Sequence, residues 1–124
     1  MIDPKELMIN DWVSTPIGVA QVSELHHSTV IVDKNVSAFY DVVKPIPLTD
    51  EMLLLNGFQV RITSNKWFWK ANFPFNIIST DDSSDPYDVT MDSIIVKVIF
   101  YVHELQNLLR TTGLKDFADN FKLE

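Results

Sequence analysis

The pair His103-Glu104 is the first group in this sequence that suggests a chemical activity. A histidine followed by a glutamate begins the H-E-x-x-H motif of zinc peptidases, in which both histidines bind the metal from one helix face. The second histidine of that motif falls on Asn107 in this chain. Because zinc needs several nitrogen, sulfur or carboxylate ligands, the sequence does not predict a metal site here. A solvent-facing helix surface accounts better for these residues.

Four residues of the same segment are candidate binding residues: Tyr101, His103, Gln106 and Asn107. Two interpretations of them stay open. In the first, they form a polar patch that recognises a partner. In the second, Gln106 or Asn107 hydrogen-bonds backbone groups of an adjoining strand, because polar groups that a fold buries are almost always paired. We favour the second, structural interpretation.

A cluster of aromatic residues has a strand-like pattern in the middle of the chain. Trp67, Phe68 and Trp69 lie between Lys66 and Lys70, and two more phenylalanines follow. Alternation along a strand places Trp67 and Trp69 on one face and Phe68 on the other. Exposed tryptophans beside lysines can stack on nucleic-acid bases or anchor a peptide. The alternative, which we favour, is that a short helix and the C-terminal helix cover both faces.

Two further groups have side chains that could act as cation ligands. Neighbouring residues of a strand point to opposite faces, so His26-His27 predicts a turn rather than a metal site. The segment 80–92 is polar and holds five aspartates, but it lacks the D-x-D-x-D-G order of a calcium-binding loop. We therefore predict an exposed acidic loop, no metal site and no cofactor.

The elements that position these residues are organised around the segment 93–114. Its first part, 94–100, is rich in β-branched residues and interrupted only by Lys97, which predicts a mostly buried strand. Apolar residues then recur at helical spacing, and Gly113 fits the left-handed position that ends a helix, with Leu109 and Leu114 as the apolar pair of the cap. One continuous helix from Ile94 is the alternative.

The rest of the chain predicts an α+β fold. Residues 6–44 read as short strands with turns about every eight to twelve residues, typical of an SH3-like β meander or barrel. A proline-rich connector leads to a short helix capped by Thr49 and ended by Asn56-Gly57. A small antiparallel sheet follows, packed on the C-terminal helix. We expect two subdomains, 1–47 and 48–124, that share one core.

Composition sets the limits of this interpretation. A chain of 124 residues with 46% hydrophobic and 22% charged residues is typical of a globular domain or of two small subdomains. The absence of cysteine fits a reducing compartment. The N-terminal residues lack the basic and apolar regions of a secretory signal, and the apolar run near residue 94 is shorter than the ~18 residues of a membrane span. We therefore expect a cytoplasmic protein that does not enter a membrane.

Two longer motifs are more specific than composition. Residues 45–58 read PIPLT-x-E-x-L-x-x-x-GF, and residues 101–113 read YVH-x-LQNL followed by TG. Together they resemble a family of small uncharacterised proteins encoded in phages and mobile elements of Bacteroides-type bacteria. That family also has a turn before an apolar pair near its N-terminus, matched here by residues 10–13, although Asn10 stands where glycine is expected. The resemblance covers nearly the whole chain and implies an origin but no biochemical activity.

Three functional hypotheses follow, in order of preference. The first is a non-enzymatic interaction module that binds a protein, either an unrelated partner or another copy of itself. The second is a nucleic-acid-binding accessory protein that uses the barrel surface and the aromatic strand. The net charge of −7 disfavours it because phosphate binding normally needs a basic stripe. The third is a hydrolase of unknown type. With no cysteine and only three glycines, the chain offers no thiol nucleophile or glycine-rich phosphate loop, and no catalytic residue is assigned.

Overall fold

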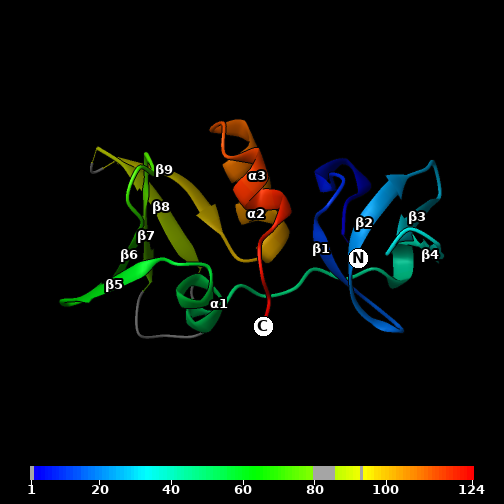
Figure 1. Ribbon diagram of the computed structural model, residues 1–124, viewed down its shortest axis with the longest axis horizontal. Helices are drawn as coiled ribbons and strands as arrows, with labels where there is room; N and C mark the ends of the chain where they lie inside the picture. The colour runs from blue at the N-terminus through cyan, green and yellow to red at the C-terminus, as the bar shows by residue number, and fades with distance from the viewer. Residues whose placement is uncertain (1, 80–85, 93) are drawn as a thin grey trace. The chain divides into compact units, whose positions relative to one another are not determined.

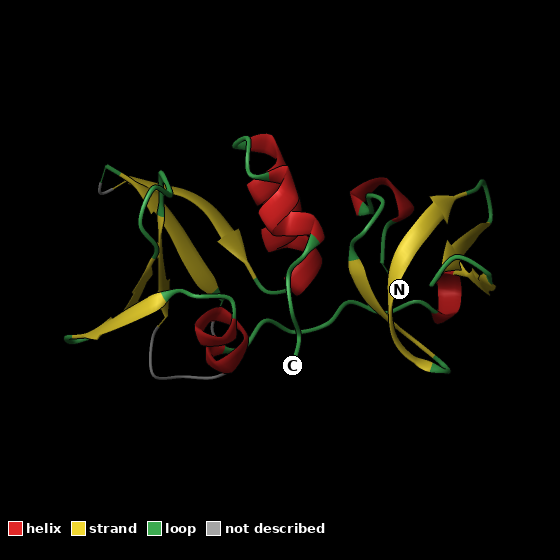
Figure 2. Ribbon diagram, in the orientation of Figure 1, coloured by secondary structure: helices red, strands yellow, loops and turns green. Residues whose placement is uncertain are grey.

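The computed structural model describes residues 2–79, 86–92 and 94–124, and it confirms the α+β class. The chain divides into two compact units (Figures 1 and 2). The first unit comprises the residues up to Pro47 together with Tyr101–Asn120, and the second comprises Leu48–Phe100 with Phe121–Glu124. Each unit contains one antiparallel sheet, of four strands in the first and five in the second.

The sheet of the first unit is an open meander. Its strands pair in the order in which they occur: β1 (Trp12–Thr15), β2 (Gly18–Leu25), β3 (Thr29–Val32) and β4 (Val36–Phe39). The predicted meander is therefore confirmed, whereas its closure into an SH3-like barrel is not, because β1 and β4 are not paired. Inward-facing aliphatic residues of these strands form a core with Ile2, Leu7, Tyr40 and Val43.

Short helical turns flank this sheet. The 3₁₀ helix η1 (Pro4–Glu6) precedes it, and a second, η2 (Tyr40–Val42), follows β4. We predicted short strands with turns throughout residues 6–44, but the last strand ends at Phe39. The buried ring of Tyr40 gives the reason, since its hydroxyl donates a hydrogen bond to the carbonyl of His26, 2.8 Å away. That contact turns the chain out of the sheet.

The C-terminal helices α2 (Val102–Thr111) and α3 (Lys115–Asp119) also belong to the first unit. The transition from strand to helix near residue 100 is confirmed, and so is the predicted cap. Gly113 has a φ of 84°, and the amide of Leu114 donates to the carbonyl of Leu109 at 2.8 Å. The prediction placed this helix in the segment 48–124, whereas the structure groups it with the first sheet. Buried polar contacts described below hold it there.

The second unit begins with the short helix α1 (Asp50–Leu55), whose predicted N-cap is present because the hydroxyl of Thr49 accepts the amide of Met52 at 3.3 Å. Its five strands pair in sequence order: β5 (Gln59–Ile62), β6 (Lys66–Trp69), β7 (Asn76–Ser79), β8 (Tyr87–Met91) and β9 (Ile94–Ile99). β5 and β6 form a hairpin within the small antiparallel sheet that the sequence predicts. One face of the sheet is buried through Phe68, Ile77, Val89 and Ile99.

Two strands of this sheet differ from the prediction. We expected an exposed loop over residues 80–92; residues 80–85 lie outside the described part, but Tyr87–Met91 forms strand β8. Tyr87 and Val89 alternate inward there, and the neighbouring aspartates concealed that alternation. Strand β9 was predicted to be mostly buried, yet only Ile99 is buried. β9 lies at the edge of the sheet, where little of the protein covers it.

The turn before β1 supports a prediction about backbone conformation. Asn10 has a φ of 73°, a left-handed conformation that asparagine tolerates and β-branched residues resist. We expect Asn10→Gly to change the free energy of unfolding by less than about 0.5 kcal/mol, and Asn10→Val to lower it by about 1–2 kcal/mol. Urea denaturation measures both variants. Equal stability of the two variants would contradict the left-handed conformation assigned to residue 10.

Candidate functional site

The outer face of the second sheet exposes two tryptophans. Phe68 is 1% exposed, whereas its neighbours Trp67 and Trp69 are 36% and 40% exposed. The predicted alternation along this strand is therefore present. The favoured expectation that both faces are covered is not met, because the indoles are only partly shielded. A large aromatic surface on a rigid strand is available to another molecule.

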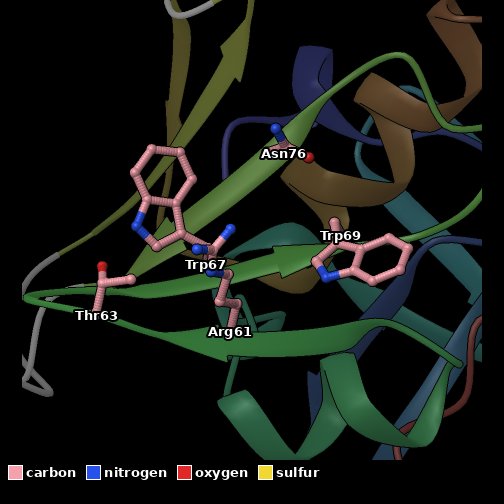
Figure 3. A pocket seen from close by; sticks show the side chains of 5 residues that line it. All are labelled: Arg61, Thr63, Trp67, Trp69 and Asn76. Atoms are coloured by element: carbon pink, nitrogen blue, oxygen red, sulfur yellow. The ribbon is translucent and has the colours of Figure 1, made fainter.

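The two indoles line a pocket of about 380 Å³ together with side chains from the neighbouring strands (Figure 3). Arg61 and Thr63 come from β5 and the turn after it, and Asn76 from β7. Arg61 lies directly opposite Trp67 in the antiparallel register, so both project from the same face of the sheet. We call Arg61, Thr63, Trp67, Trp69 and Asn76 the tryptophan face.

Arg61 supplies the positive charge of the tryptophan face. It is exposed and has no salt bridge with another residue in the described part of the chain. The lysines that border the tryptophans in sequence have other contacts. Lys66 forms a salt bridge of 2.9 Å with Asp50, and the Nζ atom of Lys70 lies 5.9 Å from the centre of the Phe73 ring. The sequence pattern pointed to these lysines and missed Arg61, because Arg61 comes to the tryptophans only through the pairing of β5 with β6.

The register extends this surface across the whole sheet. Trp67 lies opposite Ile78, Ile78 opposite Asp88, and Asp88 opposite Val98 on β9. These residues therefore share the face of the tryptophans. The surface changes from aromatic and cationic near β5 to aliphatic near β9. Its described residues offer stacking surface, apolar contact, one guanidinium and the carboxylate of Asp88, but no nucleophile paired with a base.

Gln106 belongs to the first unit, whereas the tryptophans belong to the second, and it is fully buried. Its Oε1 atom accepts the amide of Trp12 at 2.9 Å. Its Nε2 atom donates to the carbonyls of Asn10 and Ala118, at 3.0 and 2.9 Å. Gln106 therefore joins β1, the turn before it and α3, as the structural interpretation expected.

The other candidate residues of α2 contact the first unit in the same way. The amide of Asn107 donates to the carbonyl of Glu6. His103 is buried, with its Nε2 atom 3.4 Å from a carboxylate oxygen of Glu6, and its ring stacks on that of Tyr101 at 6.0 Å between centres. The predicted solvent-facing surface is thus wrong for His103. Sequence periodicity could not show that the polar side of the helix meets backbone groups.

A buried ion pair in the first unit was missed by sequence reasoning. Asp11 is fully buried, accepts the amide of Met8 at 2.9 Å and forms a salt bridge with Arg110. Arg110 also contacts Asp119 at 3.2 Å and the Oδ1 atom of Asn107 at 2.8 Å. The sequence around Asp11 indicates only a turn, and the position of Arg110 indicates only a cation suited to the end of a helix. Only the tertiary fold brings the two together.

The pKa values of the two carboxyl groups shift in opposite directions. Burial raises the pKa of Asp11, and the hydrogen bond from Arg110 offsets only part of that effect. Burial also acts to raise the pKa of Asp119, but hydrogen bonds from Lys115 and Arg110 outweigh it and the pKa is lowered. These shifts have structural causes, because both groups are engaged with cations of the same unit.

A second polar cluster fixes helix α1 against the second sheet. The hydroxyl of Tyr87 donates to Asp50 at 2.6 Å, on the carboxylate that also pairs with Lys66. Burial and the hydrogen bond to Asp50 raise the pKa of Tyr87. The cluster therefore keeps its tyrosine protonated and its aspartate engaged, which suits a structural contact.

Within residues 2–79, 86–92 and 94–124, no group of three or more histidine, aspartate or glutamate side chains is arranged to hold a metal ion. None of the helices in that part of the chain has the length and apolar character needed to cross a membrane. No protein-family model, curated protein or solved structure matches the chain. The tryptophan face is the feature that a functional proposal can use.

Proposed function

We propose that this chain is a non-enzymatic interaction module that binds a protein partner through the tryptophan face. The exposure of Trp67 and Trp69 carries the proposal. Tryptophan and arginine are the residues that most often dominate the energy of protein interfaces. Here both indoles and Arg61 project from neighbouring strands of one sheet. A partner side chain that fills the pocket between them would gain both apolar contact and a hydrogen-bonded charge.

The scaffold under the tryptophan face supports this proposal. Phe68 is buried on the opposite face, and the Lys66–Asp50–Tyr87 cluster ties the start of β6 to α1 and β8. A surface held in this way loses little conformational entropy when a partner binds. Positions on strands also hold side chains more accurately than positions on loops.

A nucleic-acid accessory role is the second candidate, and one observation favours it. Two indoles beside a guanidinium can stack on bases while the cation contacts phosphate. The net charge of −7 acts against phosphate binding. The two roles differ in salt dependence: nucleic-acid affinity should fall steeply as salt is added, whereas an apolar protein contact should change little.

The origin in a phage or mobile element also remains our proposal. The resemblance rests on motifs whose residues have structural roles, such as the cap residue Thr49, Gly57 with a φ of 90°, and buried Gln106. Relatives that keep those motifs would keep the fold and not necessarily the partner. A cytoplasmic location fits the same proposal, because the chain contains no cysteine.

Alanine variants of the two tryptophans test the proposed function. We expect Trp67→Ala and Trp69→Ala to remain folded, and each to weaken binding to a partner by at least about 30-fold, as for interface hot spots. Partners would be isolated from cells that carry the phage or mobile element, purified, and titrated by calorimetry against each variant. Circular dichroism and thermal unfolding establish that the variants are folded.

Phe39→Ala is the matched control, since Phe39 is an exposed aromatic residue on a strand of the other sheet. This variant should bind the partner as the natural chain does. Unchanged affinity in both tryptophan variants would refute the proposal. A partner that proves to be nucleic acid, lost on adding salt, would favour the second role.

A further inference from the structure

The tryptophan face is rich in hydrogen-bond donors that the protein itself does not use. The indoles of Trp67 and Trp69 each carry an N–H group, and the guanidinium of Arg61 and the side-chain amide of Asn76 carry several more. Within residues 2–79, 86–92 and 94–124, none of these side-chain donors has an acceptor. Figure 3 shows the guanidinium between the two indoles. The pocket therefore presents free donors beside apolar rings.

Acceptors are scarce among the same side chains. Arg61 and the two tryptophans have none, so the side-chain oxygens of Thr63 and Asn76 are the acceptors that the tryptophan face supplies. A ligand with many exposed N–H groups would leave most of them unpaired on this surface, and an unpaired group that loses its water costs free energy. The occupant should therefore bring acceptors and few donors.

The backbone beneath the indoles cannot supply the missing acceptors. β6 is an interior strand, paired with β5 on one side and with β7 on the other. A ligand therefore cannot bind β6 by adding a strand, which requires a free sheet edge. A helix is also a poor match for the free donors, because its carbonyl groups are engaged in its own hydrogen bonds. The recognised segment needs carbonyl groups that remain free.

A polyproline II segment combines these properties. It has no internal hydrogen bonds, so its carbonyl groups are free to accept. Proline lacks the backbone N–H group, and its ring is apolar. Proteins bind such segments in grooves lined by aromatic side chains. Because the proline ring already fixes φ, the segment loses little conformational entropy on binding.

We propose that the tryptophan face binds an extended, proline-rich segment of the partner protein, with an acidic side chain of that segment on Arg61. Proline rings pack on the indoles of Trp67 and Trp69, and the carbonyl groups accept from the indole N–H groups and from Asn76. Arg61 is exposed and has no salt bridge in the described part of the chain. Its guanidinium can hold a carboxylate by two parallel hydrogen bonds. This inference rests on the proposed function and adds to it the chemistry of the partner.

The charge of the surface favours this segment over a single-stranded nucleic acid, which is also rich in acceptors. Asp88 lies on the same face of the sheet as Trp67, and the net charge of the chain is −7. A nucleic acid brings a row of phosphates and needs several cations to neutralise them. Arg61 is the one cation of the tryptophan face and matches a single carboxylate.

Three capped peptides of about nine residues, or three turns of a polyproline II helix, test the inference on the full-length chain. The first has prolines around a central glutamate. The second replaces the glutamate by glutamine, and the third keeps it but replaces the prolines by alanine. ¹⁵N NMR follows the indole N–H signals of Trp67 and Trp69, with that of Trp12, in the other unit, as the internal control.

We expect the first peptide to shift the indole signals of Trp67 and Trp69 and to leave that of Trp12 unchanged. It should bind about fivefold more tightly than the glutamine peptide, as for an exposed ion pair. It should bind at least about tenfold more tightly than the alanine peptide, which lacks both the rings and the fixed φ angles.

Variants separate the two parts of the inference. Arg61→Gln should remove the preference for glutamate and leave the affinity for the glutamine peptide unchanged. Trp69→Phe keeps an aromatic ring but loses the N–H group, and it should weaken both proline peptides by about fivefold. Lys97→Gln removes an exposed cation on β9, at the edge of the sheet, and is the matched control that should change neither affinity.

Three results would overturn the inference. The first is that millimolar proline peptide leaves both indole signals unshifted. The second is that the glutamine or the alanine peptide binds as tightly as the first. The third is that an oligothymidine shifts the same signals at a lower concentration than the peptide, which would identify nucleic acid as the occupant. The proposed function survives the first two results if Trp67→Ala and Trp69→Ala still weaken binding to the isolated partner.

Discussion

Replacing Gln106 by methionine is expected to lower the free energy of unfolding by about 3 kcal/mol, although the two side chains have similar size. The substitution removes the hydrogen bond that Gln106 accepts from the Trp12 amide and the two that it donates to the carbonyls of Asn10 and Ala118, in the interior of the first unit. The Asn10 carbonyl keeps a hydrogen bond from the side chain of Gln21, and the Ala118 carbonyl keeps one from the amide of Asn120. An interior group left unsatisfied costs about 1–3 kcal/mol and one that keeps another partner costs less, while the better burial of methionine returns part of the loss. Urea denaturation of the full-length chain measures the difference.

The chain offers a matched control at another glutamine. Gln59 is exposed on β5, so Gln59→Met makes the same chemical change in solvent. Its effect should stay within about 0.5 kcal/mol, as for most surface substitutions. Two variants of equal stability would show that Gln106 does not hold the three backbone groups together.

Removing the guanidinium of the buried ion pair is expected to be still more destabilising. Arg110→Met should lower the free energy of unfolding by about 3–5 kcal/mol near pH 7, because it leaves the carboxylate of Asp11 buried without its cation. Arg110 also contacts Asp119 and Asn107, so the helix end loses those contacts too. Unfolding is measured in urea, because guanidinium chloride is a salt and would screen the interaction between the charges of Asp11 and Arg110.

The pH dependence of this variant has a definite sign. The pKa of Asp11 is already raised in the folded state by burial, and without Arg110 it would rise further. A carboxyl group whose pKa is higher in the folded than in the unfolded chain lowers the free energy of unfolding as the pH rises above the unfolded pKa. The reason is that the carboxyl group ionises more readily in the unfolded chain. Asp119, whose pKa is lowered partly by Arg110, loses stabilisation in the same variant above its unfolded pKa. The loss of stability in Arg110→Met should therefore become smaller as the pH is lowered from about 7 to about 4.

A double variant separates charge from packing. Asp11→Asn combined with Arg110→Met removes both charges and leaves an amide oxygen that can accept the Met8 amide. It should recover a large part of the stability lost in Arg110→Met, because replacing both partners of a buried pair costs less than breaking it. The role assigned to Asp11 would be contradicted if the stability lost in Arg110→Met did not depend on pH, and if the effects of the two substitutions simply added in the double variant.

Local chemistry made much of this fold predictable from sequence. Thr49 begins a helix and Gly113 ends one because each acts on backbone groups within a few residues. The same holds for Trp67 and Phe68, since alternation along a strand is a property of the strand itself. The sequence therefore predicted most elements and the two-sided character of β6.

The remaining features depend on distant partners. β9 has the composition of a buried strand, but its burial depends on its position in the sheet, and it lies at the edge. Gln106 fits a solvent-facing or a buried role equally well until the turn before β1 is placed beside it. Asp11 and Arg110 are far apart in the sequence and nothing local marks them as a pair.

The division of the C-terminal residues between the two units has a consequence for synthesis on the ribosome. Tyr101–Asn120 completes the first unit and Phe121–Glu124 the second, where the side-chain amide of Asn56 hydrogen-bonds the backbone of Lys122 at both its nitrogen and its oxygen. A nascent chain that still lacks these residues can finish neither core. Neither unit is therefore complete until residues 101–124 have been synthesised, and an early stop codon near residue 100 would leave two incomplete bodies for proteases rather than one functional half.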